Sequence, residues 1–95
     1  IVDLRSLAPI DKELIFERVK LHNKCLIITE EPEGQTFARS LAGLIQDVCF
    51  KNLDAPVKVL SAKDVPAIPL NSILEEFMLP NADKAYTAMK ELLDY

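Results

Sequence analysis

The chain contains no tryptophan, one histidine, two cysteines and two glycines among its 95 residues. Two cysteines are too few for a disulfide scaffold, and a zinc site needs closer cysteine spacing with histidine partners. The glycine-rich fingerprints of dinucleotide and phosphate binding are absent, and so is the G-x-S-x-G turn of serine hydrolases. We therefore expect two reduced thiols, at Cys25 and Cys49, and no recognisable catalytic motif.

Charge and hydropathy exclude two further classes of partner. The formal net charge is −4, which disfavours nucleic acid and anionic membranes and suits a basic protein surface. The longest apolar runs, such as residues 25–28, are far too short to cross a bilayer. We expect neither nucleic acid nor a membrane as a partner.

The apolar pattern predicts strands that alternate with helices. Residues 1–4 and 57–60 have strand composition, and residues 24–30 form a strand whose core is continuously apolar. Such a strand is typical of a parallel sheet covered by helices on both faces. Helices are predicted from Asp11 to Asn23 and over residues 35–50.

A turn is predicted at residues 30–34, after the apolar strand. In the second half of the chain, residues 61–70 are predicted to form an irregular, proline-containing loop. A short helix is predicted from Ser72, and a last helix from Asn81, with Ala85, Met89, Leu92 and Leu93 on its inner side. The prediction is one α/β domain over residues 1–95, three-layered, with a mostly parallel central sheet and room for one antiparallel strand. Because the chain begins within a strand-like run, we expect it to be part of a longer protein.

Three features allow more than one interpretation. His22 suits a cation at a helix C-terminus, and a catalytic base is the alternative. Glu30, Glu31 and Glu33 form either a solvated turn or a site for a hard cation. Gly34 is either a turn glycine or part of an anion site at a helix start.

Five short motifs give the chain a family resemblance. They are V-D-L-R-S-L-A-P-I-D at 2–11, L-I-I-T-E-E-P at 26–32, L-D-A-P-V at 53–57, D-V-P at 64–66 and L-P at 79–80. In this order and spacing, they resemble the C-terminal domain of transketolase-like, thiamine-diphosphate-dependent enzymes. The greatest similarity is to the β subunit, or β half, of the decarboxylating component of 2-oxo-acid dehydrogenases, of the pyruvate or branched-chain (2-oxoisovalerate) type.

The chain also departs from the family pattern. Thr29 stands where the family often has histidine, and residues 34–38 replace a glycine-rich T-G-G-F-G. Roles of that histidine and of those glycines are therefore not carried over. The loop at residues 67–72 also differs in length. Together these departures suggest a divergent branch, in which the α and β halves are either separate subunits or fused in one chain.

The resemblance implies how the work is divided in the parent enzyme. The parent binds thiamine diphosphate and Mg²⁺ between its other domains, decarboxylates a 2-oxo acid and reductively acylates a lipoyl group. It implies that this domain binds no cofactor or metal, holds no catalytic residue and is inactive alone. The parent is a dimer or heterotetramer, cytoplasmic in a bacterium and in the mitochondrial matrix in a eukaryote.

The resemblance also implies a docking role. In many members this domain receives the small subunit-binding domain of the acyltransferase core, through an acidic residue and a terminal carboxylate. The matching positions are Asp54 and Tyr95. From the residues alone, Asp54 is better interpreted as a turn residue or a spacer after a helix C-terminus, before Pro56. Only the resemblance makes docking an equal alternative. The alternatives are the C-terminal domain of a transketolase or a deoxyxylulose-phosphate synthase, and a non-catalytic α/β docking module.

Overall fold

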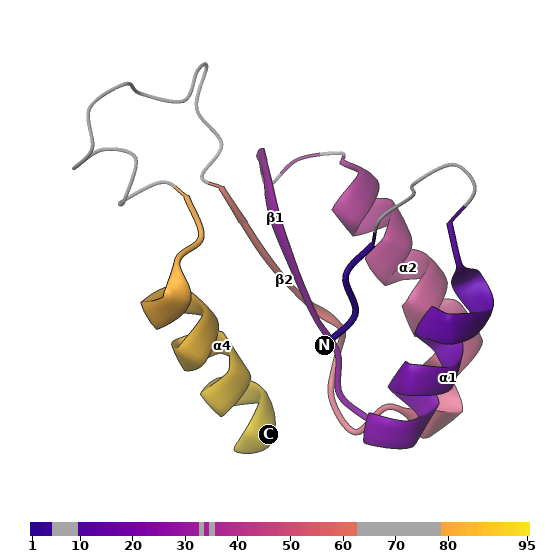
Figure 1. Ribbon diagram of the computed structural model, residues 1–95. Coiled ribbons are helices and arrows are strands. Elements are labelled where there is room, and N and C mark those ends of the chain that lie inside the picture. Colours follow the sequence, from indigo (N-terminus) through magenta and orange to yellow (C-terminus); the bar gives the residue numbers. More distant parts are fainter. Residues whose placement is uncertain (5–9, 33, 35, 63–78) are drawn as a thin grey trace.

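The computed structural model describes residues 1–4, 10–32, 34, 36–62 and 79–95 of the chain (Figure 1). Its elements follow in the order α1 (Lys12–His22), β1 (Leu26–Pro32), α2 (Phe37–Cys49), the 3₁₀ helix η1 (Phe50–Asn52), β2 (Lys58–Ala62) and α4 (Ala82–Leu93).

The two strands form a parallel sheet, as the continuous apolar run predicts. Leu26 pairs with Lys58, Ile28 pairs with Leu60, and the register then shifts before Pro32. Parallel strands require a crossover connection, and α2 supplies it between β1 and β2.

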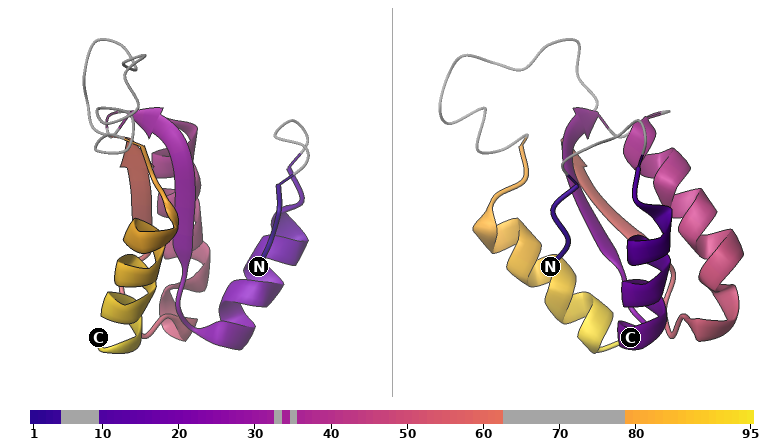
Figure 2. Two further views of the ribbon diagram at one scale, coloured as in Figure 1. Left: turned by 60° about the vertical axis from the view of Figure 1, so that its left-hand side comes forward. Right: turned by 45° about the vertical axis from the view of Figure 1, so that its right-hand side comes forward.

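Helices cover both faces of this sheet. Both α2 and α4 contact β1 and β2, and α1 packs against α2. In Figure 1 and in the right-hand view of Figure 2, the strands run between α4 on one side and α1 with α2 on the other. The described part of the chain therefore has the predicted α/β architecture.

The helix ends lie close to the predicted positions, because local side chains cap them. Asp11 accepts a hydrogen bond from the Leu14 N–H at 3.1 Å, and Asn81 accepts one from the Lys84 N–H at 2.8 Å. Asn23 ends α1 in the left-handed region, with φ of 66°. Asparagine tolerates this conformation better than most residues, as expected for a helix C-terminus.

The core lies between α1, α2 and the sheet. Residues from both helices are buried in it, and half-buried apolar residues from the neighbouring segments surround them. The buried members are Ile15, Val19, Leu41, Ile45 and Cys49.

Three predictions about the elements are wrong. Residues 1–4 are not a strand, because β1 pairs only with β2 in the described residues and Ile1 and Val2 remain exposed. Glu30 does not begin a turn, since β1 continues to Pro32. A proline at the very end of a strand is tolerated because few ladder bonds are lost there.

The third error concerns the face that α4 turns to the sheet. Ala88 and Leu92 are buried, whereas Met89 and Leu93 are 49% and 73% exposed. Leu92 is buried as predicted and Ala85 is half-buried, so the prediction is wrong for Met89 and Leu93. Residues 61 and 62 of the predicted loop at 61–70 belong to β2. The rest of that loop, the D-V-P motif and the helix predicted from Ser72 lie outside the described residues.

Candidate docking surface

Asp54 is exposed because its neighbours face the core. Leu53 is half-buried, Ala55 is only 6% exposed, and Asp54 between them faces solvent. The loop is fixed beyond them by the Val57 N–H, which donates to Oε1 of Gln46 at 3.1 Å. The L-D-A-P-V motif thus presents one carboxylate on an anchored loop.

The turn after α1 holds this loop from the other side. The Asp54 N–H donates to the Asn23 carbonyl at 2.8 Å. The Asn23 amide group donates to the Asn52 carbonyl at 2.6 Å. Two hydrogen bonds therefore join the end of α1 to the segment that carries Asp54.

The same turn also reaches the end of α4. Nζ of Lys24 donates to the Leu93 carbonyl at 3.3 Å. Tyr95 follows directly, with its N–H bonded to the Leu92 carbonyl at 3.3 Å and its side chain 74% exposed. Figure 1 places the end of α4 and the turn after α1 at the same end of the molecule.

We call this region the docking end: Asn23, Lys24, residues 50–54 and residues 93–95. The structure brings both predicted docking residues, Asp54 and Tyr95, to it. Because β1 and β2 are parallel and both begin here, the docking end lies at the amino ends of the strands. Phe50, Leu93 and Tyr95 add apolar surface to it, each at least 70% exposed.

The docking end does not carry charge of one sign. It contains Lys24 and Lys51 as well as the carboxylates of Asp54 and Asp94, and Lys20 and His22 of the last turn of α1 lie outside it. A mixed surface favours recognition by particular pairs of side chains over attraction by a broad acidic field. His22 lies where a cation favours a helix C-terminus.

At the opposite edge of the sheet, Glu31 fixes the start of α2. Its two carboxylate oxygens accept hydrogen bonds from the Phe37 and Ala38 N–H groups, both at 3.1 Å, and Oε1 also accepts from the Thr29 hydroxyl at 3.1 Å. Thr36 is the N-cap and accepts from the Arg39 N–H at 3.4 Å. Glu31 therefore neutralises the helix start from within the protein.

This contact decides between the interpretations of the acidic patch. Glu30 and Glu31 lie in β1 rather than in a turn, and Glu31 is committed to α2 rather than to a cation, whereas Glu33 lies outside the described residues. Because a carboxylate already accepts from the Phe37 and Ala38 N–H groups, the start of α2 gives the anion-site interpretation of Gly34 no support. A Cβ added at Gly34 meets nothing within 4 Å, so no close approach requires glycine there.

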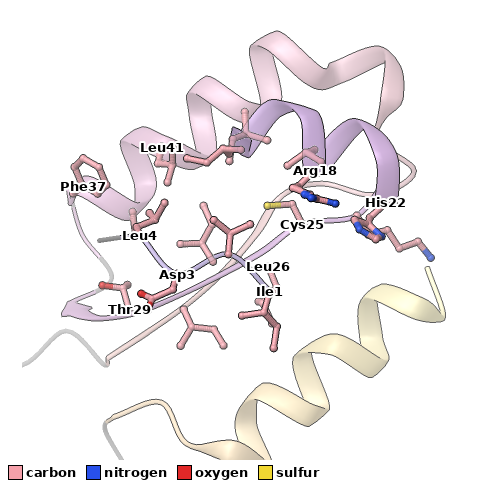
Figure 3. A pocket seen from close by; sticks show the side chains of 18 of the residues that line it. Ile1, Asp3, Leu4, Arg18, His22, Cys25, Leu26, Thr29, Phe37 and Leu41 are labelled. Atoms are coloured by element: carbon pink, nitrogen blue, oxygen red, sulfur yellow. The ribbon is translucent and has the colours of Figure 1, made fainter. Parts of the chain in front are cut away.

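A groove of about 850 Å³ opens between residues 1–4, α1, β1 and α2. Its polar groups are spread apart: Asp3 and Thr29 lie at one end, and Arg18 and His22 at the other (Figure 3). Among the described residues that line the groove, apolar side chains separate these groups and no convergent set for acid–base chemistry is formed, so the catalytic interpretation of His22 gains no support here.

Both cysteines are free thiols, as predicted. Cys49 is fully buried, and Cys25 is half-buried against the core. Burial raises the pKa of the Cys25 thiol, and the neighbouring Cys49 raises it further. A thiol held protonated is a poor nucleophile.

Within the described ranges, no three histidine, cysteine or acidic residues gather to hold a metal ion. In the same part of the chain, no helix combines the length and hydropathy that a membrane span requires. The docking end is thus the most distinctive candidate site among the described residues.

The architecture and this exposed, anchored end define a small α/β module with a parallel sheet between helical layers. The pattern of the transketolase C-terminal domain matches residues 1–85, and the chain belongs to that family.

The relatives of the chain are subunits of oxidoreductases. The chain is 37% identical over its whole length to the 2-oxoisovalerate dehydrogenase subunit beta of Bacillus subtilis. It is 36% identical, also over its whole length, to the pyruvate dehydrogenase E1 component subunit beta of Rickettsia felis. It covers 29% of the length of each of these relatives.

Three residues that hold these segments in place were not predicted from the sequence. Asn23 was expected only as a helix end, and neither Lys24 nor Glu31 was assigned a contact. Lys24 bonds a residue 69 positions away and Asn23 one 29 positions away, so no local pattern points to either contact. The T-x-E spacing of Thr29 and Glu31, just before a helix, is the one local signal for the Glu31 cap.

Proposed function

We propose that this chain is the C-terminal structural and docking domain of the decarboxylating component of a 2-oxo-acid dehydrogenase, in its β subunit or β half. Family membership and the 37% identity to a 2-oxoisovalerate dehydrogenase β subunit carry this proposal. The oxidoreductase names of both relatives support it over a transketolase or a deoxyxylulose-phosphate synthase.

The parent enzyme would decarboxylate a 2-oxo acid and transfer the acyl group to a lipoyl disulfide, which is reduced as it is acylated. Thiamine diphosphate, with Mg²⁺, would supply the electron sink for decarboxylation. The described residues do not fit this group. They form no cluster of metal ligands, and the Glu31 carboxylate at the start of α2 would repel a diphosphate. We assign cofactor binding and catalysis to other domains of the parent.

The domain itself would hold partners. We propose that it contacts the other domains and subunits of a dimeric or heterotetrameric decarboxylating component. We also propose that its docking end receives the subunit-binding domain of the acyltransferase core. Asp54 is exposed and anchored by backbone hydrogen bonds on both sides, which suits a charge-assisted pair with arginine. Tyr95 and Leu93 offer exposed apolar surface at the same end.

The place of the parent in the cell follows from this assignment. Its relatives include a Bacillus subtilis subunit and one named mitochondrial, from Dictyostelium discoideum, which is 33% identical to this chain. We propose a cytoplasmic parent in a bacterium and a matrix parent in a eukaryote.

The reaction is tested on the intact parent enzyme. Purified with its partner subunit, it should reduce an added dye acceptor when given a branched-chain 2-oxo acid or pyruvate, and only with thiamine diphosphate and Mg²⁺ present. Two-carbon transfer between sugar phosphates, without 2-oxo-acid turnover, would favour the transketolase alternative. Turnover by the isolated 95-residue chain would contradict the assignment of catalysis to other domains.

The docking role is tested by calorimetric titration of the parent with the isolated subunit-binding domain of its acyltransferase. Asp54→Asn should weaken binding by about tenfold or more, because one charge-assisted hydrogen bond is lost. Asp47→Asn is the matched control, since Asp47 is an exposed carboxylate on α2 and loses the same charge. Equal affinities of the two variants would remove Asp54 from the site.

A further inference from the structure

We propose that Asn23 and Lys24 form a positioning element, which fixes Asp54 and the end of α4 relative to each other for the docking partner. The inference rests on the proposed docking function and goes beyond it, because neither residue need touch the partner. The two docking segments, residues 50–54 and 93–95, are far apart in the sequence. Asn23 and Lys24 connect them through hydrogen bonds to each.

Asn23 does more than end a helix. A helix end needs only the bond from the Asn23 N–H to the Val19 carbonyl, at 2.8 Å. Asn23 also donates from its side chain to the Asn52 carbonyl at 2.6 Å, and its backbone carbonyl accepts from the Asp54 N–H at 2.8 Å. One residue therefore bonds the backbone on both sides of Leu53 and restrains the segment that presents Asp54.

Lys24 extends the same restraint to α4. Its Nζ donates to the carbonyl of Leu93, the last residue of the helix, at 3.3 Å. Carbonyls of the last helical turn lack a partner within the helix, and a cation there is favoured. Because Asn23 and Lys24 are consecutive, the Asp54 loop and residues 93–95 are held at one separation.

A fixed separation matters for a partner that contacts both segments. If the two segments moved independently, the partner would have to order them on binding, and affinity would fall without loss of any contact. Charge alone predicts the opposite sign for Lys24. Removing a positive side chain near a basic partner should raise affinity, so a loss on its removal reports positioning.

The test uses calorimetric titration of the intact parent enzyme with the isolated subunit-binding domain. Lys24→Met removes the bond to α4, and Asn23→Gly keeps the left-handed turn while it removes the side-chain bonds. Each should weaken binding about fivefold, the equivalent of roughly one neutral hydrogen bond. Lys20→Met is the matched control: it removes a charge from the same end of α1 and should leave affinity equal or slightly raised.

Coupling to Asp54 separates positioning from general damage. Asn23→Gly should weaken binding in the parent but have little further effect in an Asp54→Asn background. The Asp54 N–H keeps its bond to the backbone carbonyl of residue 23, but it should exchange hydrogen faster in Asn23→Gly because the loop loses its restraint at the Asn52 carbonyl. An equal loss in both backgrounds would overturn the inference. The inference would also be overturned if Asn23→Gly and Lys24→Met bound with unchanged affinity while Asp54→Asn still weakened binding. That result would leave the proposed docking function intact. Unchanged affinity of Asp54→Asn would instead refute the docking function.

Discussion

Glu31 offers the sharpest test of how this fold is held together. The structure makes its carboxylate the connection between the end of β1 and the first N–H groups of α2, with bonds of 3.1 Å to Phe37 and Ala38. Replacing Glu31 by glutamine removes the charge but keeps the size. Replacing it by alanine removes both acceptors.

The magnitude follows from what each variant leaves unpaired. A side-chain cap at a helix start contributes about 1 kcal/mol, and a negative charge there adds roughly 0.3–1 kcal/mol. Glu31→Ala should therefore lower the free energy of unfolding by about 2 kcal/mol. Glu31→Gln keeps one acceptor oxygen but points an amide group at the other N–H. It should therefore lower the free energy of unfolding by about 1 kcal/mol.

The assay is urea unfolding followed by circular dichroism, with Glu30→Gln as the matched control. Glu30 is the preceding residue of β1, is exposed, and loses the same charge. We expect the free energy of unfolding of Glu30→Gln to stay within about 0.5 kcal/mol of that of the unsubstituted chain. If Glu31→Gln were no less stable than Glu30→Gln, Glu31 would not connect β1 to α2 as described.

Two further predictions concern α4 and the thiols. Leu92→Ala should lower the free energy of unfolding by about 2–4 kcal/mol because Leu92 is 7% exposed, whereas Leu93→Ala, at a residue 73% exposed, should change it by less than about 0.5 kcal/mol. Equal losses for the two variants in thermal unfolding would restore the face predicted from the sequence, which included both leucines. Because burial raises the pKa of the folded Cys25 thiol above its ordinary value of 9.0, the unfolded chain loses that proton first, so stability should fall as pH rises from 9.0 through the folded pKa. Cys25→Ala should lessen that fall, and an identical pH dependence in both proteins would contradict the assignment.

Local signals predicted the ends of the helices well. Asp11 and Asn81 are polar residues just before apolar periodic segments, and both cap their helices. The continuously apolar run at residues 25–28 likewise indicated a parallel, covered strand, and β1 pairs in parallel with β2. These features depend on a few neighbouring residues, so the sequence carries them directly.

Features that depend on distant residues were not predictable in the same way. The length of β1 and the role of Glu31 depend on where α2 begins, several residues later. The inner face of α4 was misjudged at Met89 and Leu93, because their large apolar side chains outweigh Ala88 in any periodic pattern, although Ala88 and Leu92 are the buried residues.

The candidate site shows the same division. Asp54 came from a resemblance of short motifs, since the residue alone suits an ordinary turn. Its anchoring by Asn23, and the contact of Lys24 with the end of α4, required the folded chain.

The docking assignment is tested most directly by a hydrogen-exchange footprint of the parent enzyme with and without the subunit-binding domain of its acyltransferase. We expect slower amide exchange over residues 50–54 and 93–95, at the amino ends of the strands, and no change over residues 29–38 at the carboxyl ends. Protection confined to residues 29–38, or to the groove beside residues 1–4, would contradict it.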